Sequence, residues 1–403
     1  MSTLSSSTGV SQRLEALSGS ATLAISAKAV ELRAYGHDVI GFGAGEPDFP
    51  TPDHVVRAAE KACADPVAHH YTPAGGLPAL REAIVRKTER ESGLVASPEE
   101  VLVCNGGKHA LYNVFQALID PGDQVLLPAP YWVSYPEQVR LAGGRVVSMP
   151  TTAAGDFRVT VEQLDEAWTP QTKALIFVSP SNPTGAVYAP DEVEAIGRWA
   201  VERGIWVVTD EIYEHLVYGD ATFASMPVRV PELRERCVVV NGVAKTYAMT
   251  GWRVGWSIAP VTLTKAMTRL QSHLCSNVAN VSQRAALAAV EGPLDVVETM
   301  RTAYDRRRRV ARELLDGIEG VHCPLPEGAF YAFPSFEALL GTAVGDQVVE
   351  TSAQLCTALL KTAQVALVPG EGFGAPGYAR VSYALADDDL RRGLERMAEV
   401  LGR

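Results

Sequence analysis

The chain has 403 residues, which is long enough for two domains of roughly 100 to 200 residues each. Apolar residues make up 47% of it and charged residues 21%, close to the averages of globular proteins, so the composition excludes extended disorder, a collagen-like fibre and a small disulfide-stapled protein. With 47 acidic and 36 basic side chains the net charge is −11, which disfavours nonspecific binding to nucleic acid or anionic lipid.

The N-terminal residues 1–12 are rich in Ser and Thr and lack the basic start and apolar run of a signal peptide, so we expect a flexible arm. No apolar stretch approaches the roughly 20 residues needed to cross a bilayer, and membrane insertion is not expected. The six cysteines are dispersed, without a CxxC pair or metal-ligand spacing. Reduced thiols and a cytoplasmic location follow as expectations.

Short apolar, β-branched runs recur through the central part of the chain. Helical patterns such as residues 192–203 separate several of them, which is the rhythm of a mostly parallel sheet with crossover helices. The expected strands are residues 101–103, 124–127, 174–178, 205–209 and 237–240. The pattern therefore predicts an α/β fold.

A charged helical pattern covers residues 296–315 and could link two domains. Its four consecutive arginines, Arg306 to Arg309, could form a nucleic-acid patch, but acidic neighbours favour a solvated helix face. Strand-like pieces at residues 328–333, 365–368 and 378–383 then alternate with helices, the last beginning after Asp387. We expect a smaller α+β unit here.

Several polar or glycine-rich segments follow the expected strands, where open α/β sheets place their ligands. After the first strand, Gly106 and Gly107 lead into a helix whose N-terminal N–H groups could bind a phosphate, unless this is a plain turn. Trp132 could stack on a planar ring or simply pack in the core. Asn182, between two prolines, is either held for a directed hydrogen bond or part of an ordinary turn.

Two charged residues come directly after apolar strands. Asp210 could partner a protonated ring nitrogen, or cap a helix that begins there. Lys245, if removed from water, would have a lowered pKa and attack carbonyl groups, although most lysines are solvated. The adjacent His69 and His70 cannot face one point and have no other ligand at metal spacing, so we expect no metal site.

Taken in order, these segments resemble the class I aminotransferases, which are fold-type I enzymes that use pyridoxal 5'-phosphate. The resemblance is greatest to the bacterial aspartate aminotransferase subgroup. It is carried by GAGEPDF at residues 43–49, GGK at 106–108, Tyr131 with Trp132, NPTG at 182–185, Asp210 with Tyr213, Lys245 with Arg253 eight residues later, and ARVSY at 379–383.

The resemblance implies how the chain divides. After the arm of residues 1–12, a large cofactor-binding domain with a mostly parallel sheet would cover residues 48–300. A smaller α+β domain would combine residues 13–47 with residues 301–403, so that it is discontinuous in sequence.

The resemblance also implies the cofactor contacts. Lys245 would form a Schiff base with pyridoxal 5'-phosphate and then act as the general base. Asp210 would pair with the pyridinium nitrogen, and Tyr213 with Asn182 would bind the phenolic oxygen. Trp132 would stack on the ring.

The phosphate would be held by the backbone N–H groups of Gly107 and Lys108 and by the Arg253 guanidinium. Tyr71 would reach it from a neighbouring subunit, which implies a homodimer.

Substrate contacts follow from the same resemblance. Arg380 would bind the α-carboxylate as a two-point fork, helped by Gly45, Asn182 and Trp132. Residues 271–280 offer no counterpart of the distal-carboxylate arginine of the best-known members, and the bacterial subgroup uses the lysine that matches Lys108. Gly242 departs from the family, because many members carry a phosphate-binding Ser there.

The implied activity is aspartate:2-oxoglutarate transamination by a ping-pong mechanism. Three alternatives stay open: a prephenate, aromatic or secondary-metabolism aminotransferase, a β-eliminating lyase, and a non-catalytic regulator that senses pyridoxal phosphate. A regulator needs a DNA-binding segment, and the stretch before Leu23 is too short for two helices.

Overall fold

The computed structural model describes residues 9–19 and 21–402. Most of the expected arm therefore lies outside the described residues, and within the remainder Gln12 begins the short helix α1 (Gln12–Glu15). None of the described helices combines the length and apolar character needed to cross a membrane.

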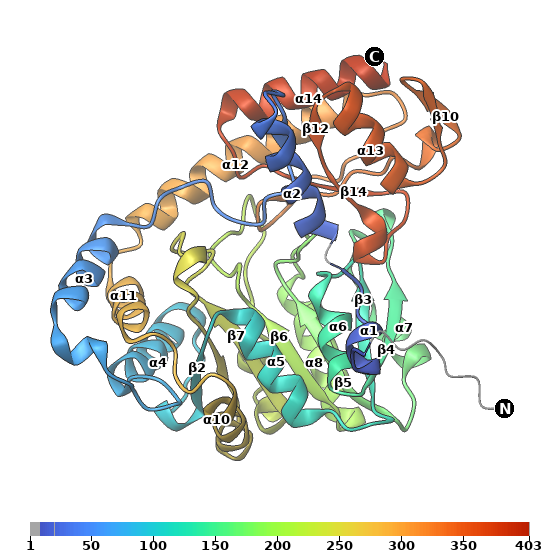
Figure 1. The fold of residues 1–403 in the computed structure, drawn as a ribbon. Helices are drawn as coiled ribbons and strands as arrows, with labels where there is room; N and C mark the ends of the chain where they lie inside the picture. Colours follow the sequence, from blue (N-terminus) through green and yellow to red (C-terminus); the bar gives the residue numbers. More distant parts are fainter. Residues whose placement is uncertain (1–8, 20, 403) are drawn as a thin grey trace.

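A seven-stranded sheet forms the centre of the molecule (Figure 1). Its order is β2-β8-β7-β6-β5-β3-β4, and all strands are parallel except β8, which is antiparallel to both neighbours. The strands are β2 (Val101–Cys104), β3 (Gln124–Ala129), β4 (Arg145–Pro150), β5 (Thr172–Val178), β6 (Trp206–Asp210), β7 (Cys237–Gly242) and β8 (Gly255–Ile258). All five expected central strands are present, and the α/β fold class is confirmed.

The sheet is buried on both faces because successive side chains of each strand point to opposite sides. In β2, Val101 and Val103 join one hydrophobic core, whereas Leu102 and Cys104 join the other. The first core is completed by α3 (Asp53–Ala64), α4 (Pro78–Ser92), α7 (Val161–Ala167), α8 (Pro190–Arg203), α9 (Met226–Arg229) and α11 (Asn280–Glu291). The second is completed by α5 (Gly107–Leu118), α6 (Ser134–Leu141) and α10 (Val261–Leu274).

A further core joins residues near position 40 to residues after 300, and Figure 1 shows the N-terminal helix α2 beside the C-terminal helices. Its strands are β1 (Ile40–Gly41) paired with β12 (Val365–Ala366), the set β13 (Val368–Pro369), β14 (Ala379–Ser382) and β9 (Tyr331–Ala332), and the hairpin of β10 (Thr342–Val344) and β11 (Gln347–Val349). Its helices are α2 (Ala21–Ala34), α12 (Asp295–Asp316), α13 (Ser352–Thr362) and α14 (Asp387–Leu401).

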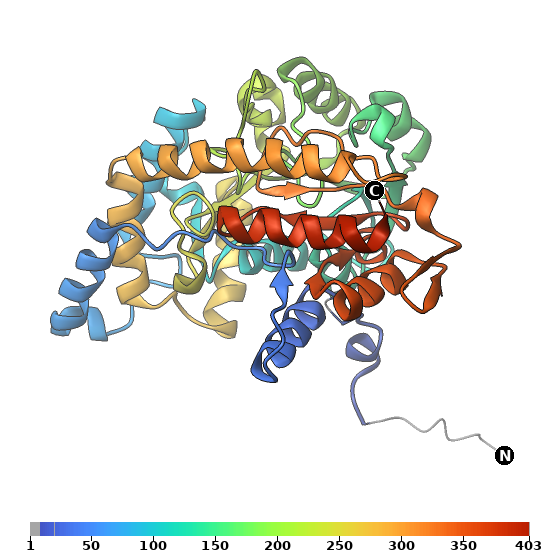
Figure 2. The same cartoon turned by 90° about the horizontal axis from the view of Figure 1, so that it is seen from above.

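The arginine run lies on α12, which packs beside α14 (Figure 2). The expected solvated face is wrong for the two inner arginines, because Arg307 and Arg308 are 7% and 4% exposed. Consecutive residues of a helix point in directions about 100° apart, so four in a row cannot all face water. Arg307 instead bonds Asp48 and the first residue of α14, Asp387.

Candidate active site

A cavity of about 560 Å³ lies at the carboxyl ends of β5, β6 and β7, beneath α2 and β14. Parallel strands end at one edge of the sheet, which brings side chains from distant parts of the chain together there. Ten of the eleven predicted site residues line this cavity: Gly45, Gly107, Lys108, Trp132, Asn182, Asp210, Tyr213, Lys245, Arg253 and Arg380. Tyr71 lies outside this lining and is 90% exposed to solvent.

Asp210 is the last residue of β6 and is buried at the base of the cavity. Burial raises the pKa of its carboxyl to about 6, while hydrogen bonds from the Tyr135 hydroxyl and the Ile212 N–H and the charge of Lys245 oppose that rise. The Tyr135 bond is 2.8 Å long and the Ile212 bond 3.2 Å. Residues 212–215 form a turn, so the alternative of Asp210 as a helix cap is wrong.

Lys245 follows β7, and its Nζ donates a hydrogen bond to the carbonyl oxygen of Gly45. Removal from bulk water and, to a smaller extent, the positive charge of Arg380 lower the pKa of Lys245 to about 8. The carboxylates of Glu46 and Asp210 act in the opposite direction. A lysine with this pKa is partly neutral near pH 7, as a nucleophile or general base must be.

Arg380 is held rigidly on β14 and is 1% exposed. Its Nη1 donates to Asn182 Oδ1 and its Nη2 to the Gly43 carbonyl oxygen, both at 2.9 Å. The guanidinium lies over the Tyr331 ring, 4.4 Å from the centroid. Its Nε is buried without a hydrogen-bond partner among the described residues, which leaves donor capacity for an anionic ligand.

The opposite end of the cavity is formed by the start of α5. Gly106, the N-cap, has φ +83°, and Arg253 presses so close to it that an added Cβ would lie 2.6 Å from Nη2. Arg253 is itself in the left-handed region, with Nη1 bonded to the Thr250 carbonyl at 2.8 Å. A helix N-terminus beside a guanidinium is a site for a phosphate.

Lys108, the second residue of α5, points over the Trp132 ring with Nζ 4.9 Å from the centroid. Burial and the charge of Arg253 lower the pKa of Lys108. The cavity thus carries five cationic side chains against the carboxylates of Asp210 and Glu46, namely those of Arg33, Lys108, Lys245, Arg253 and Arg380. This donor set can hold a planar, anionic cofactor with a carbonyl group and an anionic substrate beside it.

Sequence reasoning missed two aromatic residues of the cavity. Tyr135 bonds Asp210, and Tyr331 shares a 2.9 Å hydrogen bond with Tyr213. Tyr135 stands three residues after Trp132, a spacing that places side chains on one face of a helix and could have drawn attention to it. Tyr331 lies in an apolar run that marks only a buried strand.

Gly242, the departure from the family pattern, is explained by packing. A Cβ at this position would lie 2.9 Å from the Gly255 Cα and 3.0 Å from the Val254 carbonyl oxygen. β7 and β8 therefore approach each other too closely for Ser at position 242 without a backbone shift.

Comparison with known proteins agrees with this geometry. The sequence profile of aminotransferase class I and II matches residues 37–397. An aspartate aminotransferase of Streptomyces avermitilis is 59% identical over 97% of this chain and 96% of its own. A probable aspartate/prephenate aminotransferase of Aquifex aeolicus is 45% identical over 98% of both chains. The structure of the Thermus thermophilus aspartate aminotransferase with maleate has a TM-score of 0.91 at 44% identity, covering 98% of this chain and 100% of that one.

Proposed function

Because the chain belongs to the aminotransferase class I and II family, we propose that it transfers the amino group of aspartate to 2-oxoglutarate by a ping-pong mechanism. Oxaloacetate leaves before 2-oxoglutarate binds, so one cavity serves both half-reactions. The observation that carries the proposal is the meeting of Lys245, Asp210 and Arg380 in one cavity, in a chain 59% identical to an aspartate aminotransferase.

The family implies pyridoxal 5'-phosphate, and the residues of the cavity fit it. When bound, this cofactor supplies an aldehyde that condenses with amines and a ring that accepts carbanion electrons. The buried Asp210 carboxylate would hold the protonated ring nitrogen, with Tyr135 keeping the carboxylate in place. Trp132 would cover the ring, and Asn182 with Tyr213 would bind the phenolic oxygen.

The phosphate would be bound by the N–H groups of Gly107 and Lys108 and by Arg253, where the structure presents a helix N-terminus and a guanidinium together. We also propose that Tyr71 completes this contact from a second copy of the chain. Tyr71 is 90% exposed in the single chain, which leaves it accessible to a second copy, as a homodimer with shared sites requires.

Lys245 would link to the cofactor and later hold the proton that leaves the substrate Cα. Its pKa of about 8 suits both roles, because near neutral pH the amine is partly unprotonated and still basic enough to take a proton.

Arg380 would hold the substrate α-carboxylate with its planar fork, next to Gly45, whose added Cβ would lie 3.9 Å from Nη2. Lys108, at the other end of the cavity, would pair with the distal carboxylate of aspartate.

We also propose that the chain divides into a large domain of residues 48–300 and a small domain of residues 13–47 and 301–403. A cytoplasmic location is part of the proposal and is consistent with the six free thiols.

An amino-donor panel tests the function. Purified protein with pyridoxal phosphate and 2-oxoglutarate should form glutamate faster from aspartate than from alanine or phenylalanine. Prephenate as acceptor tests the second activity named for the Aquifex relative. Absence of glutamate from every dicarboxylic and aromatic donor would refute the proposal, and release of ammonia and pyruvate would indicate a β-eliminating lyase.

A further inference from the structure

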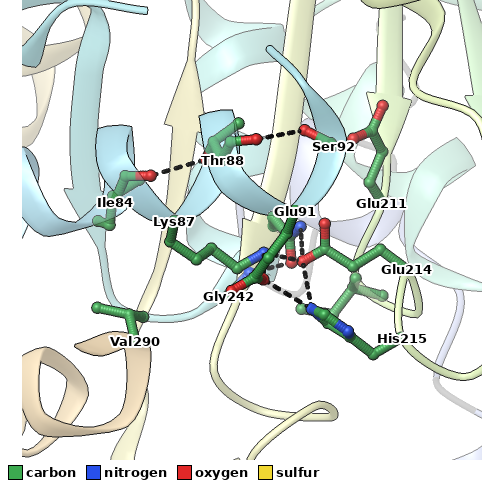
Figure 3. A network of polar contacts seen from close by, with 12 residues as sticks. Ile84, Lys87, Thr88, Glu91, Ser92, Glu211, Glu214, His215, Gly242 and Val290 are labelled. Atoms are coloured by element: carbon green, nitrogen blue, oxygen red, sulfur yellow. Dashed lines mark hydrogen bonds and ion pairs between the residues drawn. The ribbon is translucent and has the colours of Figure 1, made fainter. Parts of the chain in front are cut away.

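A buried network of charged side chains lies beside the end of β6, which carries Asp210, and the following turn, which carries Tyr213. Its centre is Lys87 on α4 (Figure 3). The Lys87 side chain is 2% exposed. The Lys87 ammonium forms ion pairs with Glu91, at 2.9 Å, and with Glu214. Burial opposes the charge of Lys87, but the two carboxylates raise its pKa, so the network is ionised.

The network resembles a metal-binding group in composition only. Glu91, Glu214 and His215 offer ligand atoms that all lie within 4.8 Å of one another. The ammonium of Lys87 contacts both carboxylates and already supplies the positive charge between them. His215 bonds Glu91 at 2.7 Å, which closes the group as an ion network.

Glu214 connects this network to both functional segments. It is adjacent to Tyr213 and four residues after Asp210, and it accepts a 2.8 Å hydrogen bond from Asn241 Nδ2. Asn241 lies in β7, four residues before Lys245, and its Oδ1 accepts from the Gly242 N–H at 2.7 Å. Glu214 thus joins the turn that follows Asp210 to the strand β7 that precedes Lys245.

The side chains of the two residues directly after Lys245 provide no polar anchor, and the first side-chain hydrogen bond beyond them is that of the Thr51 hydroxyl to the Ala248 carbonyl oxygen, at 2.8 Å. The hydroxyls of Thr246 and Tyr247 are buried with no hydrogen-bond partner among the described residues. On the N-terminal side of Lys245, the buried side-chain hydrogen bonds closest to it in sequence, among the described residues, are those of Asn241.

Such a network is a poor source of stability, because removing ions from water offsets most of their attraction. It does fix geometry, since a satisfied buried network allows few alternative arrangements. The network lies outside the cavity because the side chains of residues 210–214 point to two sides. Asp210 and Tyr213 face the cavity, whereas Glu211 bonds Ser225 and Glu214 bonds Asn241 on the opposite side.

We propose that Glu214, held by Lys87, is a positioning residue that sets the placement of Lys245 relative to Asp210 and Tyr213 through its bond to Asn241. The inference rests on the proposed function and deepens it, because it assigns the alignment of the site to residues outside the cavity.

Four variants test the proposal. Glu214→Ala removes both contacts, and Glu214→Gln keeps an oxygen that accepts from Asn241. Asn241→Ala breaks the tie while leaving the Lys87–Glu214 ion pair, and decides the question if Glu214→Ala does not fold. Arg234→Met is the matched control, because it breaks the 2.9 Å ion pair with Glu100 away from both segments.

Two measurements apply to each folded variant. The first is the dissociation constant for pyridoxal phosphate. The second is the pKa of Lys245 in the cofactor-free protein, from the pH dependence of its acetylation followed by mass spectrometry. For Glu214→Ala and Asn241→Ala we expect binding about tenfold weaker, the factor for one lost hydrogen bond, and a Lys245 pKa raised from about 8 toward that of free lysine.

Glu214→Gln should stay within about threefold of the wild type for binding, and Arg234→Met should match it in both measurements. The proposal is overturned if Glu214→Ala or Asn241→Ala melts at a lower temperature but keeps wild-type binding and Lys245 pKa. If the wild type itself fails to bind pyridoxal phosphate, the proposed function fails, while the Lys245 pKa series still decides the positioning role.

Discussion

The hydroxyl of Tyr135 donates a 2.8 Å hydrogen bond to Oδ2 of Asp210, and both side chains are buried. An isolated carboxylate at this depth would take up a proton, and burial does raise the pKa of Asp210 to about 6. The Tyr135 bond limits the rise, so that the carboxylate is largely ionised at neutral pH. The site therefore keeps a buried negative charge where a cationic ring nitrogen would bind.

This buried charge should destabilise the cofactor-free protein. The pKa of Asp210 is about 6 when folded and near 3.8 when unfolded, so the folded state binds more protons between these values and loses stability as pH rises through them. We expect Asp210→Asn to increase the free energy of unfolding at pH 8 by up to about 3 kcal/mol, and to change it little near pH 3.5. Urea unfolding of the cofactor-free proteins measures this.

The control is Asp346→Asn in the exposed β10–β11 hairpin, which should change stability by less than about 0.5 kcal/mol at both pH values. An Asp210→Asn effect of equal size at both pH values would contradict the assignment of a raised pKa to this carboxyl.

Arg380→Lys should impair every amino donor alike. A lysine cannot reproduce the fork that bonds Asn182 and Gly43, and the α-carboxylate is common to all substrates. We expect kcat/KM to fall about 10- to 100-fold for aspartate and for alanine. A loss confined to aspartate would show that Arg380 binds the distal carboxylate instead.

Lys108→Ala should discriminate between donors. Its side chain would face only the distal carboxylate, while its backbone N–H toward the phosphate is kept in the variant. Steady-state kinetics should show kcat/KM reduced about tenfold or more for aspartate and nearly unchanged for alanine. Unchanged aspartate kinetics would remove Lys108 from substrate recognition.

Gly106→Ala should weaken cofactor binding through the phosphate site, without changing the residues that contact the pyridine ring. The new Cβ would lie 2.6 Å from Arg253 Nη2, and the φ of +83° disfavours a side chain there. We expect fluorescence titration to show affinity for pyridoxal phosphate reduced at least about tenfold, because a displaced Arg253 guanidinium loses a charged hydrogen bond to the phosphate worth about 1.5–3 kcal/mol. Gly251→Ala, whose Cβ meets nothing within 4 Å, should bind like the wild type. Equal affinity in Gly106→Ala would mean that Arg253 can move without loss of phosphate contact.

The sequence patterns predicted the central strands well because those strands are short, apolar and buried on both faces. β4 and β8 were not predicted, for different reasons. The edge strand β4 carries exposed and half-buried side chains, and the sequence of β8, GWSI, contains Gly and Ser instead of a continuous apolar, β-branched run. The burial of Arg307 and Arg308 depends on Asp48, Asp387 and Asp305, of which only Asp305 is near them in sequence.

Ten of the residues predicted from the motifs lie in one cavity. They could be predicted because strand ends and turns are recognisable in sequence and meet at one edge of the sheet. Tyr135 and Tyr331 could not be identified in the same way. Their importance arises from partners on other elements, Asp210 and Tyr213, which only the packed structure brings within hydrogen-bonding distance.

The central claim is that aspartate gives up its amino group at a site built on Lys245, and the isolated first half-reaction tests it most directly. Protein loaded with pyridoxal phosphate is mixed with aspartate in the absence of 2-oxoglutarate, and oxaloacetate is quantified. We predict that the wild type forms one equivalent of oxaloacetate per active site and releases no ammonia. Lys245→Ala should form oxaloacetate far more slowly, if at all. Continuous release of ammonia, or oxaloacetate formed equally by Lys245→Ala, would contradict the account.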